Sequence, residues 1–279
     1  MKHIKLFNEH SDYETYMNGS DKVLPNVSYC ENENEVHYNP YIESVVTVTF
    51  NVTSTSEPTQ IAANGQKFGA FGMIEINILN NFAKIDIDGV KQPTINETYT
   101  FDTLGEHTVK YTLVNPTSIE NGCFLECRNI KSVIIPDGVT SIGNVAFYYC
   151  TGLTSITIPD SVTTIGTSAF QQCSGLTSVT ISNSVTSIGY QTFQYCTSLT
   201  NITIPDSVTS IGGNVFNGCS GLTSITSLAT TAPTIQSTTF YNVKSGGTLY
   251  VPSGSSGYNT WMSTSDSYLG KYSWTKVEQ

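Results

Sequence analysis

Apolar residues return at a fixed interval of 23 residues through the second half of the chain. Leucine, isoleucine, phenylalanine and cysteine each keep their own place in this period. The recurring positions are Leu153, Leu176, Leu199 and Leu222; Ile142, Ile165, Ile188 and Ile211; Phe147, Phe170, Phe193 and Phe216; and Cys127, Cys150, Cys173, Cys196 and Cys219. A unit this short cannot bury its apolar side alone, so the pattern predicts stacked coils with one continuous core over residues 116–252.

Residues 153–173 show how one unit is expected to fold. Side chains alternate along a strand, which predicts that Leu153, Ile156 and Ile158 point inward and the polar residues between them outward. A proline cannot continue a ladder, so Pro159 ends the strand. Val162 and Ile165 then return to the core, and Gly166 permits the next bend.

The element L-T-S-I-T-I-P-D-S-V-T-x-I-G-x-x-A-F-x-x-C occurs nearly whole at 153–173 and closely at 130–150, 176–196 and 199–219. It resembles the BspA-type leucine-rich repeats of surface proteins from anaerobic gut bacteria and some protists. The end of the chain resembles the same family, in which a terminal strand precedes an aromatic cap, here residues 253–279. The resemblance implies a leucine-rich-repeat solenoid that adheres to host proteins or to other cells, with no particular ligand.

The first part of the chain carries short alternating runs separated by turn residues. The runs are 44–52, 73–79, 83–88, 98–101 and 107–113, with Asp88-Gly89 and Leu104-Gly105-Glu106 between two pairs of them. This pattern predicts an Ig-like β-sandwich over residues 41–115. Residues 100–113 also resemble the last hairpin of modules that precede BspA-type repeats. The predicted fold class is therefore mainly β, with an Ig-like β-sandwich followed directly by the solenoid.

Residues 1–40 are polar and partly acidic, and they are expected to form a separate N-terminal arm or docking segment. The stretch 24–40 resembles a leader of phage structural proteins from gut bacteria. That resemblance implies a structural virion component, a head or tail fibre or decoration protein, which contacts other virion proteins through residues 1–40. A fibre would fit a trimer, but no heptad pattern indicates one, so the oligomeric state stays open.

Only 12% of the residues are charged, about half of the ~25% usual for soluble proteins, and the formal net charge is −10. The surface must therefore be polar but mostly uncharged, and no basic field is present to bind nucleic acid. The first ten residues lack the apolar core of a signal peptide, and no later segment approaches a membrane span. An extracellular, cell-surface or virion location is expected, without membrane insertion.

Residue clusters that could carry chemistry have simpler explanations. Cysteines in register could form disulfides or bind zinc, but each would face two equal neighbours, so we interpret them as small buried apolar residues. Asp137, Asp160 and Asp206 follow proline and are interpreted as turn residues rather than a calcium site. His3, His10, His37 and His107 share no catalytic motif and are expected at the surface or on edge strands. We therefore expect no enzyme activity, cofactor or metal.

The outward residues of the repeat strands are the predicted ligand-binding face. They are Thr154, Ser155, Thr157, Thr177, Ser178, Thr180, Thr200, Asn201, Thr203, Thr223, Ser224 and Thr226. The expected partner is a host or bacterial surface protein or a glycan. Threonine also suits any exposed strand, and regular threonine ladders can order ice-like water, so both alternatives stay open. Tyr148, Tyr149, Tyr190 and Tyr195 are further candidates for anchoring a ligand.

Overall fold

The computed structural model describes residues 31–32, 35–36, 44–62, 81–96 and 98–279. The chain divides into two units, Met1–Glu43 and Ser44–Gln279. In the first unit, β1 (Glu31–Asn32) pairs antiparallel with β2 (Glu35–Val36). The remaining residues of the predicted docking segment and the predicted strand 73–79 lie outside the described residues, so both stay predictions.

The second unit begins with an antiparallel sheet of alternating residues. Its strands are β3 (Val45–Val52), β5 (Phe82–Ile87), β6 (Val90–Lys91) and β8 (Gly105–Leu113), and β3 and β5 both pair with β8. β4 (Thr59–Gln60) and β7 (Thr98–Tyr99) form a separate short pair. Val46, Val48 and Phe50 are buried on one side of β3, as their alternation predicts. The described strands do not show a second large sheet, so the Ig-like β-sandwich is not confirmed.

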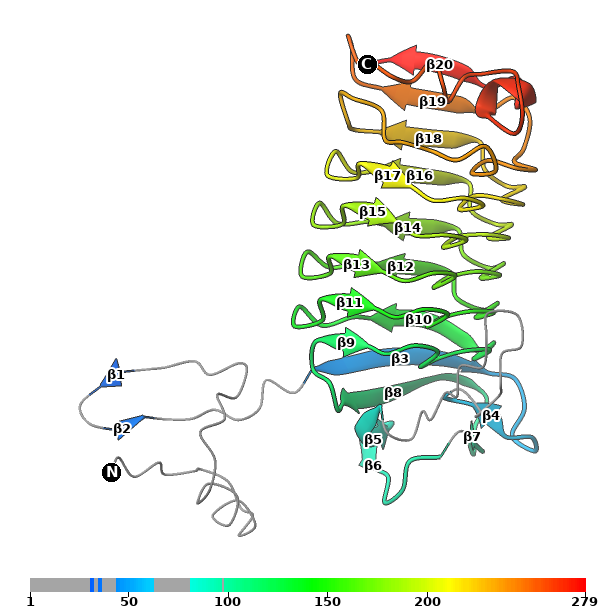
Figure 1. Ribbon diagram of the computed structural model, residues 1–279. Helices are drawn as coiled ribbons and strands as arrows, with labels where there is room; N and C mark the ends of the chain where they lie inside the picture. Colours follow the sequence, from blue (N-terminus) through cyan, green and yellow to red (C-terminus); the bar gives the residue numbers. More distant parts are fainter. Residues whose placement is uncertain (1–30, 33–34, 37–43, 63–80, 97) are drawn as a thin grey trace. The chain divides into compact units, whose positions relative to one another are not determined.

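The solenoid follows in coils that are mostly of 23 residues, with one strand on a broad side and, up to β17, a shorter strand on a second side (Figure 1). The broad-side strands are β10 (Ile130–Ile134), β12 (Ser155–Thr157), β14 (Ser178–Thr180), β16 (Asn201–Ile204), β18 (Ser224–Ser227), β19 (Thr248–Val251) and β20 (Thr275–Glu278). The second-side strands are β9 (Ser118–Ile119), β11 (Ser141–Ile142), β13 (Thr164–Ile165), β15 (Ser187–Ile188) and β17 (Ser210–Ile211). Pairing between coils is parallel and in register, with Ile156 opposite Val179. The predicted solenoid is confirmed.

One sheet runs from the N-terminal strands into the solenoid. β10 pairs antiparallel with β3 on one edge and parallel with β12 on the other, so the sheet has the order β14-β12-β10-β3-β8-β5-β6. An ion pair between Lys131 on β10 and Glu106 on β8 also crosses this junction. The first coil is therefore covered by the N-terminal strands, and the predicted boundary near residue 115 falls in the turn between β8 and β9.

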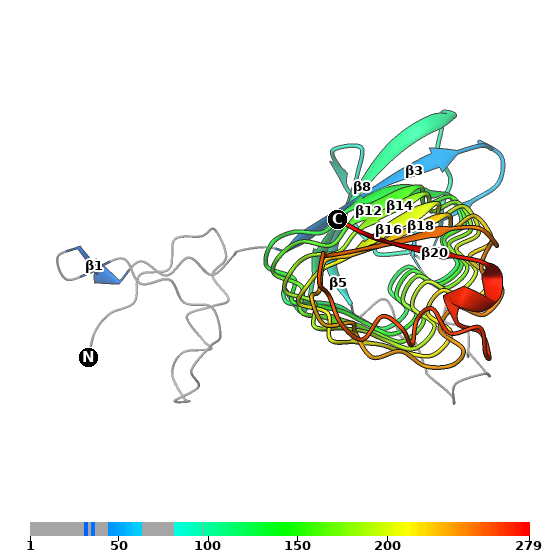
Figure 2. The ribbon, with the colours of Figure 1, turned by 90° about the horizontal axis from the view of Figure 1, so that it is seen from above.

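A column of aromatic rings forms the axis of the core. The rings of Phe124, Phe147, Phe170, Phe193, Phe216 and Phe240 stack with centroids 5.2–6.2 Å apart and planes within 12° of parallel. Tyr111 of β8 lies 5.1 Å from Phe124 at one end, and Trp261 lies 5.3 Å from Phe240 at the other. Each aromatic pair contributes about 0.5–1.5 kcal/mol beyond its burial. Seen along the axis in Figure 2, the coils close around this common core.

The cysteines accompany the phenylalanines for a physical reason. The thiols of Cys150, Cys173, Cys196 and Cys219 each donate to the phenylalanine carbonyl of the preceding coil, at 3.0–3.2 Å. All six described cysteines are buried and free, as the sequence predicts. Burial raises the pKa of the Cys173 and Cys219 thiols to about 12, which keeps them protonated and able to donate.

The C-terminal residues close the last coil with three buried aromatic side chains. The Tyr258 hydroxyl donates to Ser227 Oγ or Ala229 O, and the Trp261 indole donates to Pro233 O at 2.9 Å. The Trp274 indole lies beyond a short 3₁₀ helix, η2 (Leu269–Tyr272), and donates to Lys244 O. Each large ring therefore buries its apolar part while its polar atom has a partner.

His107 lies within β8, where it is buried rather than at the surface or on an edge strand as expected. Its Nδ1 is 2.6 Å from Asp88 Oδ2, and its Nε2 is 3.0 Å from Thr103 O. Both ring nitrogens thus face oxygen acceptors. Burial opposes the charged form of each partner, but the hydrogen bonds outweigh it, so the pKa of His107 is raised and the pKa of Asp88 is lowered.

This pair predicts a stability contribution that is greatest between about pH 4 and 6.5, the ordinary pKa values of its two members. The histidine contribution is complete below its unfolded pKa and is lost as pH rises through the raised folded value. The aspartate contribution is complete above its unfolded pKa and is lost as pH falls through the lowered folded value. We expect His107→Gln to lower the melting temperature more at pH 5.5 than at pH 8.5.

The effect should stay below about 1 kcal/mol, because the Asp88 side chain is 45% exposed and solvent screens it. Thermal unfolding followed by circular dichroism at the two pH values measures it, with Asp88→Asn as the matched variant. Equal losses at both pH values in His107→Gln would contradict the assignment.

Candidate ligand-binding face

The structure places all twelve predicted face residues on the outward side of the broad-side strands or directly beside them. Ten are exposed, and Ser224 and Thr226 are half-buried. The inward residues between them, such as Leu153, Ile156 and Ile158, are buried as predicted. The twelve side chains form three lines along the solenoid axis, and these lines differ in their hydrogen bonds.

The first line consists of Thr154, Thr177 and Thr223, which we call the ladder threonines. Each hydroxyl donates to the backbone carbonyl of the preceding coil, at 3.2 Å to Lys131, 2.9 Å to Thr154 and 3.1 Å to Thr200. Thr200 occupies the same line but accepts from the Asn201 amide at 3.1 Å. The three ladder-threonine hydroxyls therefore link neighbouring coils, and their hydrogens already take part in hydrogen bonds within the fold.

The other two lines point freely outward. We call them the serine row, which is Ser155, Ser178, Asn201 and Ser224, and the threonine row, which is Thr157, Thr180, Thr203 and Thr226. Ser155 lies opposite Ser178, Thr157 opposite Thr180, Asn201 opposite Ser224 and Thr203 opposite Thr226. Adjacent members are about 4.8 Å apart, the spacing of paired strands. Within the described part of the chain, Asn201 alone among these eight side chains makes a hydrogen bond.

Both rows extend past the repeat, which the sequence did not predict. At the N-terminal end, Ser132 lies opposite Thr49 and Ile134 opposite Thr47. At the C-terminal end, Ser224 is followed by Thr248 and Thr275, and Thr226 by Tyr250 and Val277. The strands β3, β19 and β20 do not keep the 23-residue period, so only the observed pairing reveals these extensions. β10 does keep it, with Ser132 one period before Ser155. The backbone ladder breaks once along the face, between β14 and β16.

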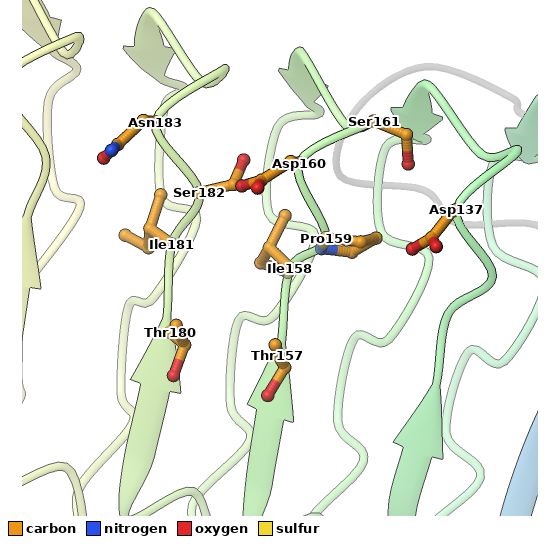
Figure 3. Close-up of a pocket in the computed structure, with 10 residues that line it drawn as sticks. All are labelled: Asp137, Thr157, Ile158, Pro159, Asp160, Ser161, Thr180, Ile181, Ser182 and Asn183. Carbon is orange, nitrogen blue, oxygen red and sulfur yellow. The ribbon is translucent and has the colours of Figure 1, made fainter.

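An open hollow of about 660 Å³ lies at the turns that follow the broad-side strands (Figure 3). Thr157 and Thr180 line it together with the turn residues of three coils, including Asp137, Asp160 and Asn183. The turns are closed by backbone bonds such as Val162 N to Pro159 O, at 3.0 Å. Asp137 and Asp160 are exposed and make no side-chain hydrogen bond to any described residue. They are turn residues as predicted, but their carboxylates do not close the turn.

The described residues hold no cluster of three or more histidine, cysteine or acidic side chains that could bind a metal ion. Among the same residues, no helix is both long and apolar enough to span a bilayer. The eight side chains of the serine and threonine rows carry hydroxyl or amide groups, and the chemistry that these groups offer is hydrogen bonding.

Comparison with known proteins places the repeat in a family. The BspA type leucine rich repeat region matches residues 117–246 in six copies. Similar solved structures include a leucine-rich repeat protein of T. pallidum, with 33% identity, 39% of this chain and 51% of that chain covered, and a TM-score of 0.39. A leucine-rich cell surface protein of Faecalibacterium prausnitzii has 21% identity, with 55% and 60% covered and a TM-score of 0.33.

The pneumococcal vaccine antigen PcpA has 17% identity, with 58% of this chain and 44% of that chain covered and a TM-score of 0.45. This chain thus spans about half the length of these solved structures. No curated protein matches it. Six matched copies, the period of 23 residues and the observed coils agree, and residues 117–246 are a BspA type leucine-rich repeat region.

Proposed function

We propose that this chain is a non-enzymatic binding protein, and that the serine row and the threonine row contact its ligand, a surface protein or glycan of host or bacterial origin. The observation that carries the proposal is two rows of short polar side chains, six of the eight exposed, of which only Asn201 has a hydrogen-bond partner among the described residues. Unused donors and acceptors on a rigid sheet lose little freedom when a ligand binds, which favours affinity. Display outside the cell is the location that the resemblance of this repeat to BspA-type surface proteins implies.

In this proposal the ladder threonines position the two rows and do not contact the ligand. By fixing the distance between coils, they hold both rows in register over β12 and β14. Ile134 adds an apolar contact at the N-terminal end of the threonine row, where it is 66% exposed. A ligand with hydroxyl or amide groups and one apolar anchor would match this surface.

The proposal is tested by placing a long charged side chain in the threonine row. Thr180→Arg should abolish binding to arrays of extracellular matrix proteins and glycans, because the arginine would stand above both rows and displace the ligand. Ser187→Arg is the matched control, since Ser187 is equally an exposed strand residue of the same coil but lies on the second side. If the unchanged, folded protein binds no array member, or if both variants bind equally, the face is not the binding surface.

A further inference from the structure

Two exposed tyrosines lie in one turn of the coil that carries β15, away from the broad-side strands. Tyr190 is 44% exposed and Tyr195 is 43% exposed, whereas Tyr148 and Tyr149 are half-buried. In the next coil, the equivalent positions are Gly213 and Gly218. A methyl group at Gly218 would come within 2.3 Å of the Tyr195 ring, and one at Gly213 within 3.4 Å of the Tyr190 ring. Both rings therefore rest against glycine backbone of the neighbouring coil.

Polar contacts fix the position of the Tyr190 ring. The Asn214 amide donates to the Tyr190 hydroxyl at 3.0 Å, and the Asn217 amide donates in turn to Asn214 Oδ1 at 3.3 Å. The ring thus spans two coils and keeps its orientation. Because the ring is already ordered, little side-chain entropy would be lost when a ligand stacks on it.

Charge restricts the kind of ligand that this turn could take. From Ser161 to Val243 the sequence holds one charged residue, Asp206, which lies in a proline turn instead. A charged polymer would find no opposite charge there. A protein partner would need about 800 Å² with an apolar centre, but the residues beside the tyrosines are mostly small and polar. A neutral polyhydroxyl ligand, whose rings stack on tyrosine and whose hydroxyls bond to amides, fits these groups best.

We propose that Tyr190 and Tyr195 form a second binding site that takes a neutral carbohydrate chain by stacking sugar rings on the two tyrosines. A third exposed tyrosine, Tyr241, is 44% exposed and lies two coils further along the solenoid. Its backbone carbonyl accepts from Gly218 N at 2.8 Å, so the coil that carries Gly218 lies between Tyr195 and Tyr241. The site does not depend on the serine and threonine rows, so either site can exist without the other.

The test uses a double variant that copies the next coil. Tyr190→Gly with Tyr195→Gly installs the residues found at Gly213 and Gly218, where the same turn already folds. Tyr195 has a φ of 58°, in the left-handed region that glycine adopts without strain, so the second change should not weaken the fold. Gln172→Gly is the matched control, because Gln172 occupies the equivalent position one coil earlier, with a φ of 60°.

Native gels containing xylan, α-mannan or a β-glucan measure binding, with heparin and polygalacturonate as charged probes. We expect at least one neutral polysaccharide to retard the unchanged protein and Gln172→Gly equally, and the double variant to bind about tenfold more weakly or worse. Retardation that is lost in Thr180→Arg but kept in the double variant would assign the polysaccharide to the threonine row and would count against this second site. The proposal is overturned if no neutral probe retards the folded protein, if only charged probes do, or if the double variant keeps its affinity.

Discussion

Replacing Phe170 with alanine should lower the free energy of unfolding by about 3–5 kcal/mol, the usual cost of removing a fully buried phenylalanine ring. Phe170 is 0% exposed and stacks on Phe147 at 5.3 Å and on Phe193 at 5.7 Å. The change removes both ring contacts and leaves a cavity in the middle of the column. Neighbouring coils cannot collapse into it, because strand pairing on two sides fixes their separation.

Urea denaturation followed by circular dichroism measures the loss. Phe170→Leu is the control, since it keeps most of the volume and should cost much less, below about 1.5 kcal/mol. Tyr190→Phe, on the surface of the next coil, should be nearly neutral. A loss below about 1 kcal/mol in Phe170→Ala would show that the phenylalanine column does not hold the coils together.

Gly166→Ala should cost about 1–3 kcal/mol or more, whereas Gly189→Ala, one coil later at the same repeat position, should be tolerated. A methyl group at Gly166 would lie 2.6 Å from the backbone nitrogen of Asn144, a distance that real contacts do not show. At Gly189 the nearest atom would be 3.2 Å away. The melting temperatures of the two variants compare them directly, and equal losses would contradict this explanation.

The coils of the two glycines differ at one asparagine. Asn144 Oδ1 accepts from Thr167 N at 2.8 Å and draws the coil that carries Gly166 close. The next coil has Thr167 at the asparagine position, and β13 and β15 are not paired. Gly166 is therefore needed for close approach between coils, and not for a bend as the sequence suggested. Its φ is not in the left-handed region.

The repeat could be predicted almost residue by residue, because period, polarity and volume recur in five consecutive coils. Ile156 and Phe170 are buried and Thr157 is exposed for reasons visible in the sequence. Sequence alone could not reveal that β10 pairs with β3, since no periodicity links a repeat strand to a strand some 80 residues earlier. The Ig-like β-sandwich is predicted from the alternation of apolar and polar residues, which indicates the buried face of each strand but not the strand with which it pairs.

The sequence predicts the twelve outward residues as one ligand-binding face. The structure separates the ladder threonines, which hydrogen-bond between coils, from the serine and threonine rows. Thr154 and Thr157 have the same side chain and both are exposed, yet only the Thr154 hydroxyl donates a hydrogen bond to a neighbouring coil. The distinction depends on hydroxyl geometry across coils, which residue type cannot encode. Tyr195 likewise owes its contact to the absence of a side chain at Gly218, a property of the residue 23 positions later.

The covered ends of the aromatic column have a consequence for how the chain can vary in length. Tyr111 closes one end and Trp261 the other, so neither cover touches the coils in the middle. An interior coil meets only its two neighbours, which are nearly identical to it. Insertion or deletion of a whole 23-residue unit would then leave both covers intact. Duplication of the coding sequence for one unit could therefore lengthen the serine and threonine rows by one residue each, which changes the length of the face but not its chemistry.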